Sequence, residues 1–129
     1  MEQLEGIEEI ANRILQENPD PVVRFRILRD VLRVAPDANA VTEARRQMLT
    51  SRWVRELRND QCKDGSWGRF HSRDSKIKKK IMTTEMGVDR GLALGLDATD
   101  QVFKPTVNYL SKLLDRSDDF PDPPEHDNR

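Results

Sequence analysis

The sequence of 129 residues contains one cysteine, and aromatic residues make up only 5% of it. A single cysteine, Cys62, excludes an internal disulfide and fits a reducing compartment. No segment approaches the roughly 20 apolar residues of a membrane span. The acidic N-terminal stretch lacks the basic start and apolar run of a signal peptide. We therefore expect a cytoplasmic protein without a membrane span.

The chain also lacks an excess of charge of either sign. Lys and Arg number 22 against 23 Asp and Glu, which gives a net charge of −1 and a pI of about 6.1. Nucleic-acid-binding domains are usually strongly basic, so we predict no nucleic-acid partner. Charged residues still make up 35% of the chain. This composition favours a highly charged, helix-rich domain.

No stretch alternates between apolar and polar residues as a strand would, whereas apolar residues recur at helical spacing. The spacing predicts five helices, near 3–16, 21–34, 40–58, 83–95 and 100–115. Asp20 is expected to cap the second helix, with Pro21 at its first position. We predict an all-α fold of antiparallel helical hairpins in one domain, 1–114. An acidic, proline-rich tail, 115–129, should be disordered or extended.

Three glycines fall four residues apart in the fourth predicted helix: Gly87, Gly91 and Gly95. Gly95 is expected to end that helix. Glycine inside a helix costs about 1 kcal/mol relative to alanine. Gly87 and Gly91 therefore predict that a neighbouring helix or ring approaches closely.

A turn-rich stretch, NDQCKDGSWG, follows the third predicted helix and opens a long loop, about 59–81. Leu57, Gln61, Gly65 and Trp67 form the pattern L-x3-Q-x3-G-x-W across the helix end. This pattern resembles the QW motif of the squalene–hopene cyclase and oxidosqualene cyclase group. That group shares an α/α-toroid fold with protein prenyltransferases. The resemblance implies that the Gln61 amide and the Trp67 ring stack and tie one helix end to another helix start.

The resemblance extends over roughly residues 20–114. DPVVRFRILRDVL is similar to the opening of bacterial members of the superfamily, and TTEMGVDRGLALGLDATD followed by VNYLSKLL has the order of a toroid repeat. Glu56 stands where the family has an aromatic residue. The resemblance implies a partial toroid of about one and a half to two helical hairpins.

Catalytic residues of this superfamily are largely missing. Class II terpene cyclases protonate an alkene with a D-x-D-D motif, which this sequence does not contain. Asp115, Asp118 and Asp119 resemble an aspartate-rich metal–diphosphate motif in scrambled order, but they stand at a helix C-terminus, where the macrodipole disfavours anions. Asp89 shares the apolar face of Met86 and is the remaining candidate acid. We expect that this chain is not catalytically competent by itself.

Cys62, His71 and Asp74 are the one group of potential zinc ligands, or of a nucleophile and its base. No two of them have ligand spacing on a helix, and nothing in the sequence indicates an orienting third group. We predict no metal and no cofactor.

The segment 69–80, RFHSRDSKIKKK, carries six basic side chains against one acid. Such a segment can bind phosphate. The candidate residues are Arg69, His71, Arg73, Lys78, Lys79 and Lys80. The alternative is a solvated loop, or one that is paired with the acidic tail.

Two functions remain open from the sequence. The chain is either a domain related to terpene cyclases that handles an isoprenoid or other apolar ligand, or a helical-repeat module that binds proteins without chemistry. A partial repeat array leaves an apolar face uncovered at its end. We therefore expect a homodimer, or a missing remainder of the toroid, with self-association through the last two helices, 83–114.

Overall fold

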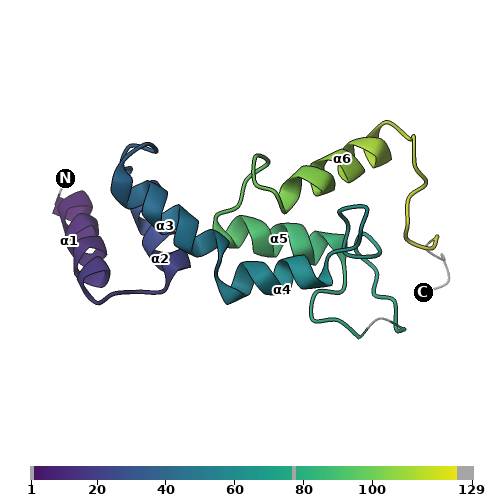
Figure 1. Cartoon of the computed structure of the whole chain (residues 1–129), viewed down its shortest axis with the longest axis horizontal. Coiled ribbons are helices and arrows are strands. Elements are labelled where there is room, and N and C mark those ends of the chain that lie inside the picture. The colour runs from purple at the N-terminus through teal and green to yellow at the C-terminus, as the bar shows by residue number, and fades with distance from the viewer. Residues whose placement is uncertain (1, 77, 125–129) are drawn as a thin grey trace. The chain divides into compact units, whose positions relative to one another are not determined.

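The computed structural model describes residues 2–76 and 78–124, and within this part the regular elements are helices (Figure 1). They are α1 (Glu2–Gln16), α2 (Pro21–Arg26), the π-helix η1 (Ile27–Val31), α3 (Asn39–Leu49), α4 (Arg52–Asp60), α5 (Thr84–Leu94) and α6 (Phe103–Leu114). The prediction of an all-α fold is confirmed. The chain divides into two compact units, 1–55 and 56–129. The sequence pattern predicts one domain over 1–114 and gives no sign of this boundary inside α4.

The third predicted helix, 40–58, is interrupted in the structure. α3 ends at Leu49 and α4 begins at Arg52. The hydroxyl of Thr50 donates a hydrogen bond to the carbonyl oxygen of Gln47 at 3.1 Å. Such local side-chain bonds compete with the helical backbone pattern and favour a helix end. The prediction of one continuous helix was therefore wrong at this point.

The first unit is built around the short helix α2. The Asp20 carboxylate accepts a hydrogen bond from the backbone N–H of Val22 at 2.9 Å, and Pro21 follows it, so the predicted cap is confirmed. The helix then widens into η1, where the N–H of Leu32 bonds to the carbonyl of Ile27 at 2.9 Å. The buried hydrophobic residues of α1, α2, η1 and α3 are Ala11, Phe25, Ile27, Leu28, Val41, Ala44 and Met48.

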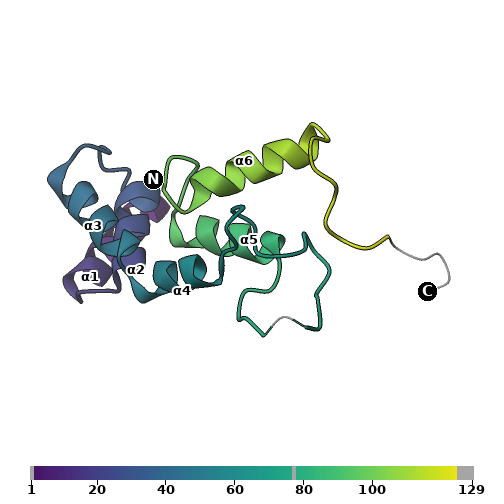
Figure 2. The ribbon, with the colours of Figure 1, turned by 45° about the vertical axis from the view of Figure 1, so that its right-hand side comes forward.

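The second unit contains the end of α4, the long segment 61–83, α5, α6 and the tail (Figure 2). The hydroxyl oxygen of Thr83 accepts a bond from the N–H of Met86 at 3.2 Å and caps α5. Gly95 ends α5 with a φ of 101°, as predicted. The buried hydrophobic residues of this unit are Leu57, Trp67, Ile81, Leu96, Val102, Phe103 and Tyr109.

Two aromatic rings explain the glycines inside α5. A Cβ atom added at Gly87 would lie 2.2 Å from the ring of Trp67, and one added at Gly91 would lie 2.1 Å from the ring of Phe103. Both distances are far below a van der Waals contact, so only glycine admits the rings this close to the helix. The predicted close approach is confirmed at both positions.

Candidate functional site

The Gln61 side chain joins the end of α4 to the start of α6. Its amide nitrogen donates to the carbonyl of Val102 at 2.8 Å, to the hydroxyl of Thr106 at 3.0 Å and to the carbonyl of Gly65 at 3.2 Å. The Thr106 hydroxyl in turn donates to the Gly65 carbonyl at 2.6 Å. One side chain therefore fixes a helix end, a turn and a helix start together.

Trp67 is connected to different elements. Its ring is 2% exposed and lies on Gly87 of α5, and its indole N–H donates to the carbonyl of Leu57 in α4 at 2.9 Å. Gly65 has a φ of 91°, and an added Cβ would lie 2.3 Å from the backbone of Pro105. In the structure Gln61 thus braces α6 and Trp67 braces α5. Gln61, Gly65 and Trp67 therefore connect α4 with α5 and α6, whereas the stacking of the Gln61 amide on the Trp67 ring that the resemblance implies stays a prediction.

The segment that follows Trp67 is held against the start of α5. The backbone N–H groups of Thr84 and Glu85 donate to the carbonyls of Arg69 and Phe70 at 2.8 and 2.9 Å. The Thr84 hydroxyl also accepts from the N–H of Trp67 at 3.0 Å. The first N–H groups of a helix have no partner within the helix. The loop supplies carbonyls to them, and its own conformation is fixed by the same bonds.

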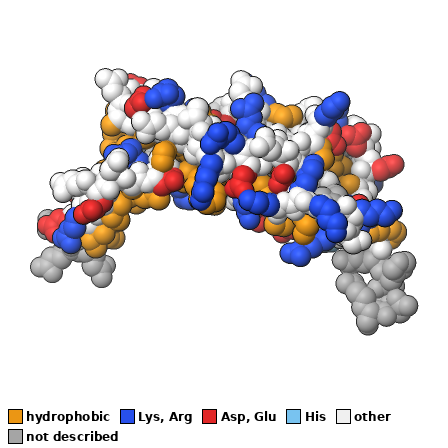
Figure 3. Space-filling view, turned by 60° about the horizontal axis from the view of Figure 1, so that its bottom comes forward, with side chains coloured by type: hydrophobic (Ala, Val, Ile, Leu, Met, Phe, Trp, Pro, Cys, Tyr) orange, Lys and Arg blue, Asp and Glu red, His pale blue; other side chains and the backbone are white. Residues whose placement is uncertain are grey.

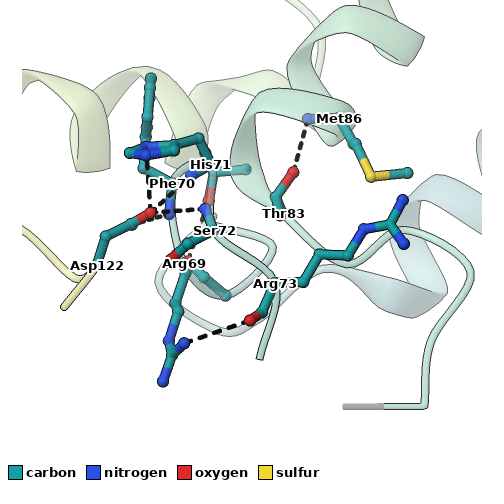
Figure 4. Close-up of polar contacts among 10 residues, drawn as sticks. Arg69, Phe70, His71, Ser72, Arg73, Thr83, Met86 and Asp122 are labelled. Carbon is teal, nitrogen blue, oxygen red and sulfur yellow. Dashed lines mark hydrogen bonds and ion pairs between the residues drawn. The ribbon is translucent and has the colours of Figure 1, made fainter. Parts of the chain in front are cut away.

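Three successive backbone N–H groups of this loop point to one carboxylate. The N–H groups of His71 and Ser72 donate to Asp122 at 2.9 and 2.7 Å, and the N–H of Phe70 also donates to it (Figure 4). The Nδ1 atom of His71 lies 3.2 Å from the same carboxylate, whose side chain is 1% exposed. Burial acts to raise the pKa of Asp122, but the three N–H bonds outweigh it and bring the pKa to about 2.

From Asp115 to Phe120 the tail is exposed and has no regular helix, but near Asp122 it contacts the loop. Asp122 is buried against the loop, and the ring of Phe120 lies 5.7 Å from that of Phe70, between centroids. The disordered or extended tail stays a prediction, and composition did not indicate that one carboxylate of this tail has three backbone donors. The suggested pairing of loop and tail is seen at Phe120 and Asp122. Residues 125–129 lie outside the described part of the chain.

Most of the basic phosphate candidates do not converge. Lys79 donates to the backbone carbonyl of Asp60 at 3.1 Å, and Lys80 pairs with Glu56 at 2.7 Å, so both fasten the loop to α4. Arg69 donates to the carbonyl of Arg73 at 3.4 Å. Arg73 and Lys78 are exposed. Among the six candidates, only His71 contacts the Asp122 carboxylate.

The remaining chemical candidates are not brought together. Asp89 is exposed, so the apolar surroundings predicted for it are wrong. Asp115, Asp118 and Asp119 are exposed as well. Among residues 2–76 and 78–124, no three His, Cys, Asp or Glu side chains gather as metal ligands would. Lys and Arg side chains are interleaved with Asp and Glu over the face in Figure 3.

A cavity lies in each of the two units. A groove of about 180 Å³ runs between α5 and α6; its lining consists of Val88, Leu92, Ala98, Phe103, Thr106, Val107 and Leu110. A larger one, about 460 Å³, lies in the first unit, with Leu15, Asn18, Arg24, Leu28, Ala40, Glu43, Ala44 and Gln47 around it. The first lining is almost entirely apolar, whereas the second mixes apolar, charged and amide side chains.

Comparisons with known proteins do not assign the chain. No family model, no curated protein and no solved structure matches it. No helix in the described ranges has the length and apolar character that crossing a membrane requires.

The sequence indicated the four motif residues but not the contact of Asp122 with the backbone N–H groups of residues 70–72. Backbone N–H groups carry no residue signature, and Asp122 is one of several acids in the tail. The sequence feature that pointed to this contact was the opposite charge of the basic loop, 69–80, and the acidic tail, 115–129.

Proposed function

We propose that the chain is a non-catalytic helical-repeat interaction module of α/α-toroid ancestry, which pairs with a second copy through α5 and α6. The observation that supports this function best is the apolar groove between these helices. Leu92 on α5 and Val107 on α6 line it, and they are 54% and 43% exposed. Exposed apolar surface of this kind commonly marks an interface.

The volume of the groove favours a protein partner over a small apolar ligand. Small-molecule sites usually measure about 300–1,000 Å³. The groove measures about 180 Å³ and is too small to enclose an isoprenoid chain. The cavity of the first unit is larger, but Arg24, Glu43 and Gln47 in its lining do not suit a hydrocarbon.

The exposed apolar stripe runs along both helices, which favours a second copy as the occupant. A two-fold pairing that sets α5 of one copy against α6 of the other covers Leu92 and Val107 of both copies in one interface. Leu114, which is 86% exposed, continues the apolar stripe of α6.

Light scattering over a range of protein concentrations tests the pairing. The mass should rise toward twice that of the chain, and Val107→Glu should abolish the rise without loss of helicity. Ile10→Glu is the control, because Ile10 is 56% exposed on α1, outside the proposed face. A monomeric mass at all concentrations, without binding of a hydrophobic dye, would show that the proposal is wrong.

A second candidate is an apolar-ligand domain whose catalytic partner lies elsewhere, as the cyclase resemblance implies. Gln61 and Trp67 each connect a helix end to another segment, and this arrangement favours shared ancestry with that group. Saturable binding of the isoprenoid alcohol farnesol by a strictly monomeric chain, without binding of a matched linear alcohol, would favour this candidate over the interaction module.

A further inference from the structure

The three N–H groups of Phe70, His71 and Ser72, called here the 70–72 amide site, form a concave set of donors around one carboxylate (Figure 4). Successive backbone N–H groups that point to one place are a common way of binding anions. The imidazole of His71, 3.2 Å from the carboxylate, adds a side-chain nitrogen to the same place.

Helix α5, and not the tail, sets the geometry of this site. The peptide group between Arg69 and Phe70 accepts from Thr84 through its carbonyl and donates to Asp122 through its N–H. The next peptide group accepts from Glu85 and donates to Asp122 in the same way. Two peptide groups thus link the positive N-terminal end of α5 to the Asp122 carboxylate, and each is polarised in the direction that favours a negative charge there. These bonds to α5 do not involve the tail.

The tail is attached to the rest of the unit at few points. After α6, the N–H groups of Ser117 and Asp118 bond to the carbonyl of Lys112 at 2.9 and 3.3 Å. From there to Asp122 the described chain makes no hydrogen bond, and Phe120 is 55% exposed. Beside Asp122, the tail contacts the loop through the ring of Phe120, whose centroid lies 5.7 Å from that of Phe70 and 6.4 Å from that of His71.

The loop carries more positive charge than one carboxylate neutralises. Arg73, Lys76 and Lys78 are exposed, and none of them pairs with a carboxylate of the described residues. Arg73 extends away from Asp122 in Figure 4, so its charge acts on the site at a distance. Their field favours an anion with more charge than a carboxylate.

We propose that the 70–72 amide site binds phosphate groups and that Asp122 is its built-in, displaceable occupant. In the tail-bound form the carboxylate satisfies the three donors. When the tail leaves, the donors need a new acceptor, and a phosphate oxygen fits the same N–H groups and the His71 ring. This inference is independent of the proposed pairing of α5 and α6.

Inorganic phosphate and the full-length chain provide the test. Asp122→Ala opens the site, and Asp119→Ala is the control, because Asp119 is an exposed acid of the same tail. Amide spectra are recorded during phosphate titration at constant ionic strength. The signals of residues 70–72 should shift saturably in Asp122→Ala. Binding should be at least about tenfold tighter than in the unmodified chain and in Asp119→Ala, since apparent affinity falls with the fraction of open sites.

Two results would overturn the proposal. If folded Asp122→Ala shows no saturable shift of the amide signals of 70–72, the contact between Asp122 and the loop only stabilises the fold. If acetate binds as tightly as phosphate, the site selects carboxylate-bearing segments instead. If Asp122→Ala does not fold, the unmodified chain provides the test. High phosphate should then shift the amide signals of residues 70–72 and, at the same concentrations, move the signals of residues 120–122 toward those of an unbound segment. Absence of this joint change would contradict the proposal.

Discussion

The ring of Trp67 lies directly on the backbone of Gly87, at a distance that leaves no room for a Cβ atom. The glycine that weakens α5 is therefore the residue that lets α5 pack on the only fully buried indole of the second unit. The helix gives up intrinsic stability, about 1 kcal/mol relative to alanine, in return for burial of a large aromatic ring.

Gly87→Ala is expected to lower the stability of the second unit by about 1–3 kcal/mol, because the added methyl group overlaps the ring and the packed core must shift. Gly6→Ala is the matched control. Gly6 is also helical, but nothing lies within 4 Å of its added Cβ, so that substitution should be neutral or stabilising. Denaturant unfolding measures both. Equal effects of the two substitutions would show that ring and helix separate easily.

Gln61→Leu should destabilise the same unit by about 1–3 kcal/mol, since the Val102 carbonyl and the Thr106 hydroxyl each lose a donor. Gln61→Glu should cost more than Gln61→Leu at neutral pH, because it places a carboxylate against a carbonyl. The folded-state pKa of that new carboxyl would be raised, so its extra cost should disappear as the pH falls below the unfolded pKa. Unfolding of both variants at several pH values is the measurement, and a pH-independent difference would contradict it.

Asp122 should make the second unit sensitive to acid. Its pKa of about 2 in the folded chain lies below the ordinary 3.8, so its contribution is complete above pH 3.8 and is lost as the pH falls toward 2. A shift of this size corresponds to on the order of 2 kcal/mol. Asp122→Asn should lower stability at neutral pH and flatten the profile in this window. Asp119→Asn should change neither, and a flat profile in the unmodified chain would rule out the effect.

How much the sequence predicted depends on whether a feature is local. Asp20 and Gly95 act on the helix beside them, and their roles could be predicted from the local pattern. Gly87 and Gly91 indicated a close approach but not which ring makes it, because Trp67 and Phe103 arrive from other segments. The end of α3 at Thr50 was not predicted, because the hydrogen bond from the Thr50 hydroxyl to the Gln47 carbonyl does not alter the apolar pattern of the sequence. The amide site was missed because backbone donors leave no trace in residue types.

Lack of turnover on isoprenoid substrates is the last expected outcome. A D-x-D-D acid is absent from the sequence, and the remaining candidate, Asp89, is exposed. The groove between α5 and α6, about 180 Å³, also cannot exclude water around a reacting polyene. Mass spectrometry of incubations with squalene and with farnesyl diphosphate should therefore detect no product above that of Asp89→Asn. Product that depends on Asp89 would show that the chain is an enzyme, and the proposal of a non-catalytic interaction module would then be wrong.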